Sequence, residues 1–241
     1  MTRRPRWLPV VAAVIATVLF VGLGSWQLRR AAEKGALLAA LDRAEAGSAV
    51  TLPADPARLA DFAYQRVRLS GRLDGAHQFL LDNRIHEGRP GFDVLVPLTR
   101  GNGDTILVDR GWVPADARRR PDRPIALQRS GEVRVQGLLW RPQPAIPLGA
   151  AVSPAGDGWP RLVTRIDYDA LGEALGTPLV PAVIRLDPSI PWALTARPLR
   201  PRFGPMRHVG YAVQWFALAI TVVVITGALL HRRRRHDRKR S

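Results

Sequence analysis

The sequence predicts an α+β membrane protein in which two transmembrane helices flank an extracytoplasmic, mainly antiparallel β domain, barrel- or sandwich-like, with short helices. Three observations predict this class. Two long stretches carry no charge, 19 of the 21 prolines lie between them, and short strand-like segments follow one another there. The 241-residue chain also has no cysteine. This excludes a disulfide framework, a thiolate metal site and thiol-based redox or copper-carrying chemistry.

The first uncharged stretch covers residues 7–26 and reads WLPVVAAVIATVLFVGLGSW. Twenty apolar residues at about 1.5 Å per residue span the roughly 30 Å hydrocarbon core of a bilayer. A cleaved signal peptide is the alternative, because three arginines precede the stretch. The stretch is longer than a usual signal core and closes on Trp26 instead of a small-residue cleavage pattern. We therefore predict a cytoplasmic tail at residues 1–6 and an uncleaved transmembrane helix at residues 7–28.

The second uncharged stretch, VGYAVQWFALAITVVVITGALL, runs from Val209 to Leu230. It also has the length of a membrane helix. The alternative is a buried helix of a soluble core, which the arginine block starting at Arg232 disfavours. The sequence thus predicts a second transmembrane helix over residues 208–230 and a basic cytoplasmic tail over residues 231–241.

The net charge of +16 and the pI near 11.6 would suggest nucleic acid as the partner of a soluble protein. The two terminal tails, however, carry +9 of this charge and the remaining chain carries +7. An excess of Lys and Arg marks the cytoplasmic side of a membrane. The far side is also basic near the spans, but long loops are largely exempt from this rule. We expect both termini in the cytoplasm, the lipid bilayer as partner of the basic tail, and no nucleic acid.

The region between the spans, residues 29–207, is predicted to begin with a helical extension of the first span. Good helix formers in LRRAAEKGALLAALDRAEAG follow Gln27, and Gly47 and Pro53 end the helix. A β domain follows, with a short helix expected over residues 168–175. Its strands are predicted over residues 65–73, 77–84, 92–99, 105–113, 132–140, 161–166 and 179–186.

The clearest turn signal is the pair Asn102-Gly103 between two strand segments. Asn-Gly supplies the positive φ angles that a tight hairpin requires. Residues 92–99 and 105–113 should therefore pair as antiparallel neighbours.

The sequence offers little support for an enzyme. It contains no G-x-S-x-G elbow, no H-E-x-x-H, no phosphate-binding glycine loop and no dinucleotide fingerprint. Its five histidines and two methionines lack the spacing of a copper or zinc site. Asp82/Arg84 and Asp109/Arg110 lie in strand segments, and we interpret these pairs as structural ion pairs, not catalytic acids.

The informative residues lie where the two predicted spans meet the extracytoplasmic surface. On a helix, the i, i+3, i+7 spacing of His208, Tyr211 and Trp215 places them on one face. Aromatic belts and arginine anchors explain part of this set, but polar groups at membrane depth usually face a partner or a cavity. A neutral imidazole can be an axial haem ligand beside arginines that pair with propionates, so His208 is a candidate ligand of haem iron. The set comprises Trp26, Gln27, Arg29, Arg30, Arg207, His208, Tyr211, Gln214 and Trp215.

Six segments carry a resemblance to a known family, and they follow one another from one predicted span to the other. They are LGSWQLRRAAEK from Leu23, VRLSGRL from Val67 with Gly71, GFDVLVPL from Gly91, ILVDRGWVP from Ile106 with Arg110, Gly111 and Trp112, VQGLL from Val135 and HVGYAVQWFALA from His208. In these segments the chain resembles the surfeit locus protein one family, the cytochrome c oxidase assembly factors. The resemblance implies a two-span protein that works in the biogenesis of haem-copper terminal oxidases and is not an enzyme.

The resemblance also implies a cofactor and partners. Some bacterial members are thought to bind haem a and pass it toward the catalytic subunit, and His208 holds the position of their proposed ligand. We expect transient haem a at His208, Tyr211, Trp215, Arg29, Arg30 and Arg207. A partner-binding or structural role is expected for Trp26, Gln27, Gly71, Arg110, Gly111, Trp112 and Gln214. The expected partners are the oxidase catalytic subunit and other assembly factors. The lack of a transit peptide favours a bacterial inner-membrane protein.

Two alternatives stay open. The chain is either a haem-handling chaperone or a cofactor-free scaffold that stabilises an oxidase assembly intermediate, and a membrane-anchored binding module unrelated to respiration is a third hypothesis. Residues 142–160 are proline-rich and lack the asparagine-containing segment of other members, so no role is carried over to them.

Overall fold

The structure is a computed structural model that describes residues 7–123, 125–127, 131–142, 151–152, 158–197, 199 and 204–238. The chain divides into two compact units, one formed by residues 1–39 and 200–241 and the other by residues 40–199. The expectations for residues 1–6 and for most of residues 142–160 lie outside the described residues.

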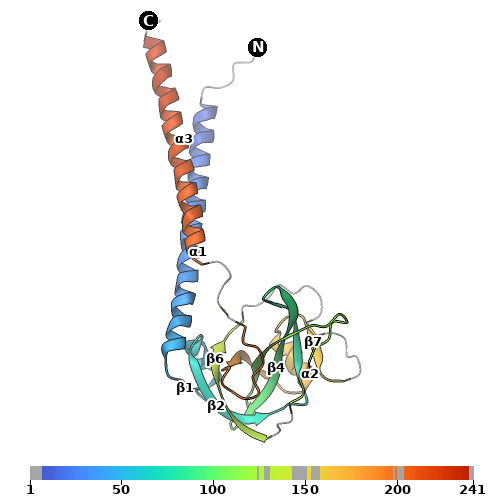
Figure 1. Cartoon of the computed structure of the whole chain (residues 1–241). Coiled ribbons are helices and arrows are strands. Elements are labelled where there is room, and N and C mark those ends of the chain that lie inside the picture. The colour runs from blue at the N-terminus through green and yellow to red at the C-terminus, as the bar shows by residue number, and fades with distance from the viewer. Residues whose placement is uncertain are drawn as a thin grey trace. The chain divides into compact units, whose positions relative to one another are not determined.

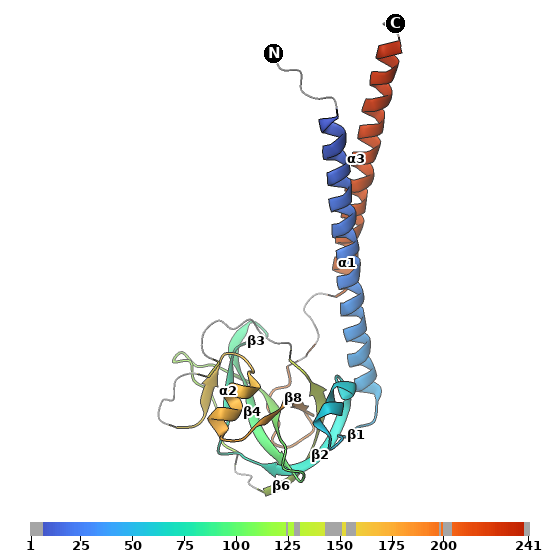
Figure 2. The ribbon, with the colours of Figure 1, turned by 180° about the vertical axis from the view of Figure 1, so that it is seen from behind.

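Two long helices dominate the first unit. α1 covers Leu8–Ala46 and α3 covers Met206–Arg238, and they lie side by side (Figures 1 and 2). The predicted extension of the first helix is confirmed, because α1 runs without a break to Ala46 and Gly47 follows it. α3 begins two residues before the predicted start of the second span and continues through the first part of the basic tail.

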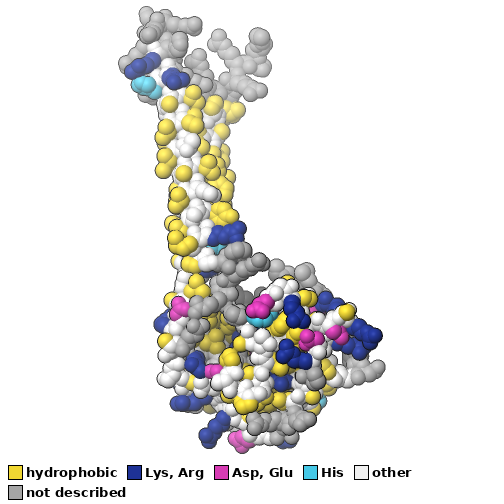
Figure 3. All heavy atoms as spheres, in the orientation of Figure 1, with side chains coloured by type: hydrophobic (Ala, Val, Ile, Leu, Met, Phe, Trp, Pro, Cys, Tyr) yellow, Lys and Arg dark blue, Asp and Glu magenta, His cyan; other side chains and the backbone are white. Residues whose placement is uncertain are grey.

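Both helices are long and apolar enough to cross a bilayer. The candidate spans Leu8–Ala44 and Met206–Arg232 have mean hydropathies of 2.3 and 2.2, and only 6% of each apolar window is buried. Large apolar side chains cover both helices (Figure 3). A core helix of a soluble protein would bury such side chains, so exposure, length and composition agree with the two predicted spans.

A mixed β-sheet forms the second unit. Its elements are β1 (Val50–Thr51), the 3₁₀ helix η1 (Pro56–Phe62), β2 (Arg66–Leu73), β3 (Phe79–His86), β4 (Arg89–Arg100), β5 (Thr105–Pro114), β6 (Gly131–Trp140), β7 (Arg161–Val163), α2 (Tyr168–Leu175) and β8 (Leu179–Leu186). All seven predicted strands and the short helix are present. β1 and η1 were not predicted, because both are too short for a periodic signal.

The sheet closes into a barrel. Its strand order is β1-β2-β6-β8-β5-β4-β3-β7, and an additional pairing of β2 with β4 completes a ring of β2, β6, β8, β5 and β4. Of the two predicted architectures, barrel and sandwich, this closure corresponds to the barrel. Among the described strands five pairings are antiparallel and three are parallel, namely β1–β2, β3–β7 and β5–β8. The sheet is therefore more mixed than predicted.

The core has two layers because the central strands bury both of their faces. Ile106 and Val108 of β5 belong to the cluster inside the ring. Leu107, between them, joins a second cluster that includes Leu171 of α2. α2 lies against β8 on this second face (Figure 2). Alternate side chains of a strand point to opposite faces, so a strand covered on both sides reads as a continuous apolar run.

Residues with positive φ angles form the turns of two β-hairpins in the barrel. β4 and β5 pair as antiparallel neighbours across Asn102-Gly103, as predicted. Gly103 has a φ of +90°, but the positive φ expected at Asn102 is not found. β3 and β4 are joined by Glu87 and Gly88, with φ angles of +49° and +78°. Positive φ at both central residues is the backbone of a type I′ turn, whose twist matches that of paired strands.

Candidate functional site

A polar contact within the helical unit joins Gln27 of α1 to His208 of α3. The Oε1 atom of Gln27 lies 2.7 Å from Nδ1 of His208. Both side chains are partly buried. Two polar groups separated by 181 positions in the sequence are thereby brought together at one depth of the helix pair.

Only part of the predicted aromatic face of α3 turns toward α1. Trp215 is partly buried, and its ring centroid lies 5.6 Å from that of Phe20. Tyr211 and Trp26 are 41% and 46% exposed, and Gln214 is exposed as well. The more buried stripe of α3 is spaced i, i+4, i+7, i+11 and comprises His208, Ala212, Trp215 and Ala219.

Three arginines lie near this pair in the chain. Arg29 and Arg30 follow Gln27 on α1, Arg207 precedes His208 on α3, and all three are exposed. Arg30 also forms an exposed ion pair with Glu33 at 2.8 Å. Exposed ion pairs of this kind are worth about 0–1 kcal/mol, so they do not prevent a guanidinium group from binding another carboxylate.

The donor set at this place suits a porphyrin iron better than a bare metal ion. The described residues contain no group of three His, Cys, Asp or Glu side chains that could hold a metal ion. A porphyrin supplies the equatorial ligands of its own iron, so the protein needs to add only an axial ligand. Nδ1 of His208 is engaged by Gln27, and within the described part of the chain its Nε2 makes no hydrogen bond. His208 therefore fits the role of an axial ligand through Nε2.

Close packing at Gly24 supports the contact between Gln27 and His208. A Cβ atom at Gly24 would come within 2.8 Å of the Phe216 ring, whereas one at Gly22 would meet nothing within 4 Å. Small residues allow two membrane helices to approach closely. Gly24 therefore sets the separation of α1 and α3 in this region.

Replacing Gly24 by leucine is expected to push α1 and α3 apart, because overpacking of this kind costs about 1–3 kcal/mol. The chain has no native cysteine, so a cysteine pair introduced as Phe20→Cys and Trp215→Cys reports helix separation by cross-linking with a short thiol-specific bifunctional reagent. We expect Gly24→Leu to reduce the cross-linked fraction and the matched variant Gly22→Leu to preserve it. Equal cross-linking in both variants would contradict the role of Gly24.

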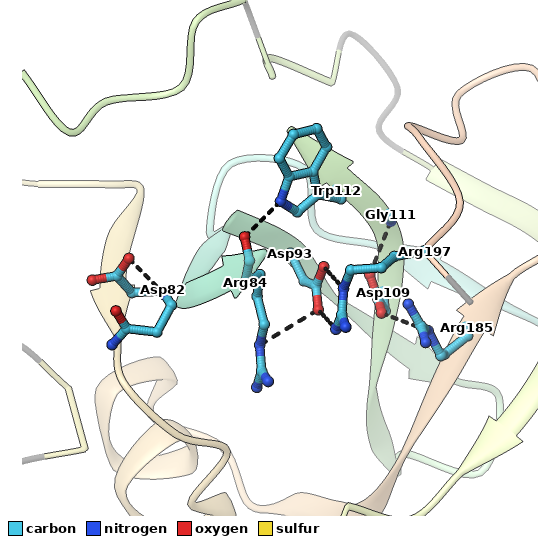
Figure 4. A network of polar contacts seen from close by, with 9 residues as sticks. Asp82, Arg84, Asp93, Asp109, Gly111, Trp112, Arg185 and Arg197 are labelled. Carbon is cyan, nitrogen blue, oxygen red and sulfur yellow. Dashed lines mark hydrogen bonds and ion pairs between the residues drawn. The ribbon is translucent and has the colours of Figure 1, made fainter. Parts of the chain in front are cut away.

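The barrel domain contains an internal charge network of its own (Figure 4). The carboxylate of Asp93 is fully buried and accepts hydrogen bonds from Nε and Nη2 of Arg197, at 3.1 and 2.5 Å. Arg84 adds a contact from its Nε atom at 3.5 Å. Beside it, Asp109 pairs with Arg185 at 3.0 Å.

Burial sets the electrostatics of this network. Desolvation raises the pKa of Asp109, although the guanidinium group of Arg185 opposes the change. Desolvation also lowers the pKa of Arg84, against the opposing charge of Asp93. The carboxylates point at arginines of the same domain, so the network holds strands and loops of that domain together.

The two predicted ion pairs, Asp82 with Arg84 and Asp109 with Arg110, are wrong. Asp82 pairs with Arg119 and not with Arg84. Asp109 does not pair with Arg110, because adjacent residues of a strand point to opposite faces. The partners come from other elements in every case, and the interpretation of these residues as structural is retained.

The Arg110-Gly111-Trp112 motif ties β5 to residues near the end of the domain. The N–H of Leu194 donates to the Arg110 carbonyl at 2.6 Å, and the Trp112 N–H donates to the Thr195 carbonyl at 2.7 Å. The buried side chain of Arg110 donates to three acceptors outside β5. Desolvation lowers the pKa of this guanidinium group. The motif therefore positions the segment that precedes α3 in the chain.

Gly71, Asp93 and Arg197 show what sequence patterns reveal and what they miss. A Cβ atom at Gly71 would lie 2.5 Å from the Thr99 carbonyl oxygen, so this glycine permits the pairing of β2 with β4 that closes the ring. Asp93 was missed, although a lone charge within the apolar run GFDVLVPL is a usable signal. Arg197 lies 104 positions from its partner and has no such signal.

A cavity of about 1260 Å³ also opens in the domain, beside the ends of β2 and β4. Its lining includes Arg72 and Arg100 together with Asp74 and Glu132. Arg100 already donates hydrogen bonds to two backbone carbonyl groups. The mixed charge favours no single class of ligand, so the helix pair is the stronger candidate site.

The sequence is similar to a known protein family and to several of its members. A family model described as the SURF1 family matches residues 14–220, which include both Gln27 and His208. An uncharacterized SURF1-like protein of Mycobacterium tuberculosis is 27% identical over 232 residues, covering 93% of this chain and 83% of that protein. The match therefore extends over both helices and the barrel.

Two other relatives match over a shorter region. A SURF1-like protein of Monosiga brevicollis is 32% identical over 139 residues, which is 53% of this chain and 53% of that protein. Surfeit locus protein 1 of Takifugu rubripes is 31% identical over 134 residues, which is 49% of this chain and 55% of that protein. The matched part spans about half the length of these two relatives.

Proposed function

The chain belongs to the SURF1 family, known broadly as cytochrome oxidase assembly factors, and from this we propose that it handles haem a for the catalytic subunit of a haem-copper terminal oxidase. The observation that carries the proposal is the imidazole of His208, held at Nδ1 by Gln27 with Nε2 left for iron. Haem supplies an iron that takes an axial nitrogen ligand and two propionates that require cationic partners.

The residues around His208 suit the propionates and the macrocycle of haem. Arg29, Arg30 and Arg207 are exposed and would pair with the propionates. The aromatic side chains of Trp26, Tyr211 and Trp215 offer apolar surface to the flat macrocycle. Their partial exposure leaves the cargo accessible to a receiving protein, as transfer requires.

We propose the inner membrane of a bacterium as the location, with two spans and both termini in the cytoplasm. The supporting features are the two apolar helices and the arginines at the end of α3. The barrel would then lie outside the cytoplasm, where it would dock on the oxidase catalytic subunit and other assembly factors. The basic tail would contact anionic lipid, and no nucleic acid is involved.

His208→Ala is expected to abolish the haem spectrum of the protein purified from cells that make haem a. The change removes the imidazole that would bind iron, and His231→Ala on the same helix is the matched control. We expect the Soret band to be absent in His208→Ala and present in wild type and His231→Ala. An unchanged Soret band in His208→Ala would refute haem handling by this residue.

A cofactor-free scaffold is the second candidate function. The observation in its favour is that the barrel completes its own core and pairs its buried charges internally, so it needs no cofactor for rigidity. As a scaffold, the protein would still co-purify with the oxidase catalytic subunit after His208→Ala. Loss of that association together with the pigment would count against the scaffold.

A further inference from the structure

The hydrogen bond between Gln27 and His208 determines which imidazole nitrogen carries the proton. The Oε1 atom of an amide has no hydrogen and can only accept a hydrogen bond. Because Oε1 of Gln27 lies 2.7 Å from Nδ1 of His208, Nδ1 must be the donor and must carry the proton. In a neutral imidazole, Nε2 is then the unprotonated nitrogen with a free lone pair.

The contact also satisfies a requirement of Gln27 itself. Its amide is partly buried on a helix that is mainly apolar from Leu8 to Leu28. A polar side chain at such a place is unfavourable unless it finds a partner. Thr17, another polar residue of this stretch, donates to the backbone of its own helix at Ala13. Gln27 instead takes its partner from α3.

We propose that Gln27 is a positioning residue that holds His208 in the Nδ1–H tautomer and aims Nε2 at a haem iron. This inference rests on the proposed function for the identity of the metal, but the tautomer is a property of the chain alone. Histidines that bind metals almost always donate their second N–H to an outer partner, which fixes ring orientation and tunes the basicity of the ligand. Gln27 performs that role from the opposite helix.

The neutral charge of Gln27 matches a cargo that must be released. A carboxylate in the same place would accept a stronger, charge-assisted hydrogen bond and make Nε2 more basic. The iron bond would then be stronger and the oxidised iron would be favoured. An amide fixes the same tautomer through a weaker hydrogen bond and makes Nε2 less basic than a carboxylate would. The weaker iron bond suits a protein that delivers haem better than one that retains it.

The first test measures the tautomer in the full chain, purified without haem in detergent and labelled with ¹⁵N histidine. The His208 signal is identified as the one missing from His208→Ala. We expect Nδ1–H in wild type and in Thr221→Val, which alters an exposed threonine of α3 that donates to its own helix at Ala217. Gln27→Met removes the acceptor and should release His208 from this tautomer. An Nε2–H signal in wild type, or an unchanged signal in Gln27→Met, would overturn the inference.

The second test measures haem binding by titration and the midpoint potential of the bound haem. Loss of an outer partner typically weakens metal affinity about 10–100-fold, so we expect that loss in Gln27→Met and none in Thr221→Val. The potential should rise in Gln27→Met and fall in Gln27→Glu. Wild-type affinity and potential in both Gln27 variants would overturn the positioning role. A wild-type chain that binds no haem would refute the proposed function instead, while the ¹⁵N spectrum would still decide the bond between Gln27 and His208.

Discussion

Asp93→Ala is expected to lower the free energy of unfolding of the barrel by about 3–5 kcal/mol, as when one partner of a buried ion pair is removed. The carboxylate of Asp93 is fully buried and accepts two hydrogen bonds from Arg197. Without it, the guanidinium groups of Arg197 and Arg84 would stay in the interior with their counter-charge lost. Thermal unfolding of the full chain in detergent, followed by near-ultraviolet circular dichroism, measures the effect.

Asp122→Ala is the matched control for this experiment. Asp122 pairs with Arg89 at 3.6 Å, and the Arg89 side chain is 65% exposed. A surface ion pair contributes about 0–1 kcal/mol, so this variant should melt close to wild type. If the two aspartate variants lost the same stability, the buried network would not be what stabilises the barrel.

Gly111→Val is expected to destabilise the barrel by about 2–5 kcal/mol, from backbone strain and steric overlap together. Gly111 has a φ of +113°, which side-chain-bearing residues rarely adopt. A Cβ atom there would lie 2.6 Å from the Thr195 carbonyl oxygen. The clash should also break the backbone hydrogen bonds of Leu194 and Thr195 with β5, and amide hydrogen exchange at these residues should become faster.

Gly103→Val separates strain from overlap. Gly103 shares a positive φ, at +90°, but a Cβ atom there meets nothing within 4 Å. Its variant should therefore lose only the strain component of about 1–3 kcal/mol, with exchange at Leu194 unchanged. Faster exchange at Leu194 in the Gly103 variant would contradict the local explanation.

The elements of this fold were predictable because their signals are local. Asn102-Gly103 specifies a turn within four residues, and helix formers after Gln27 predict that α1 leaves its apolar stretch as a helix. The partners of β8 were not predictable in this way. β8 joins β5 in parallel after the chain has passed through β6, β7 and α2. Burial of both strand faces decides such a pairing, and no short segment of sequence encodes it.

The sequence predicted the level along the two helices at which the candidate site lies, but not which of its side chains are in contact. The first apolar stretch ends and the second begins near the same predicted surface, so Gln27 and His208 were expected at one level. Which side chains then meet depends on how each helix rotates about its axis, and close packing such as that at Gly24 decides it. For this reason Tyr211, predicted on the same face as His208, is exposed beside the stripe that faces α1. The pairing of Asp93 with Arg197 escaped prediction for the same reason, since only the folded barrel joins them.

The position of β8 has a consequence for biosynthesis. β8 is the last of the described strands, yet it lies between β6 and β5 in the ring. A nascent chain that has not reached Leu186 therefore has a barrel with an open side and unpaired strand edges. Contacts between distant parts of a chain also form slowly. Met206 follows Leu186 by only 20 positions, so the ribosome delivers the closing strand and the second long helix almost together. Until β8 is added, the edges of β5 and β6 that it covers in the finished sheet stay unpaired, and unpaired strand edges are where sheets associate with other chains.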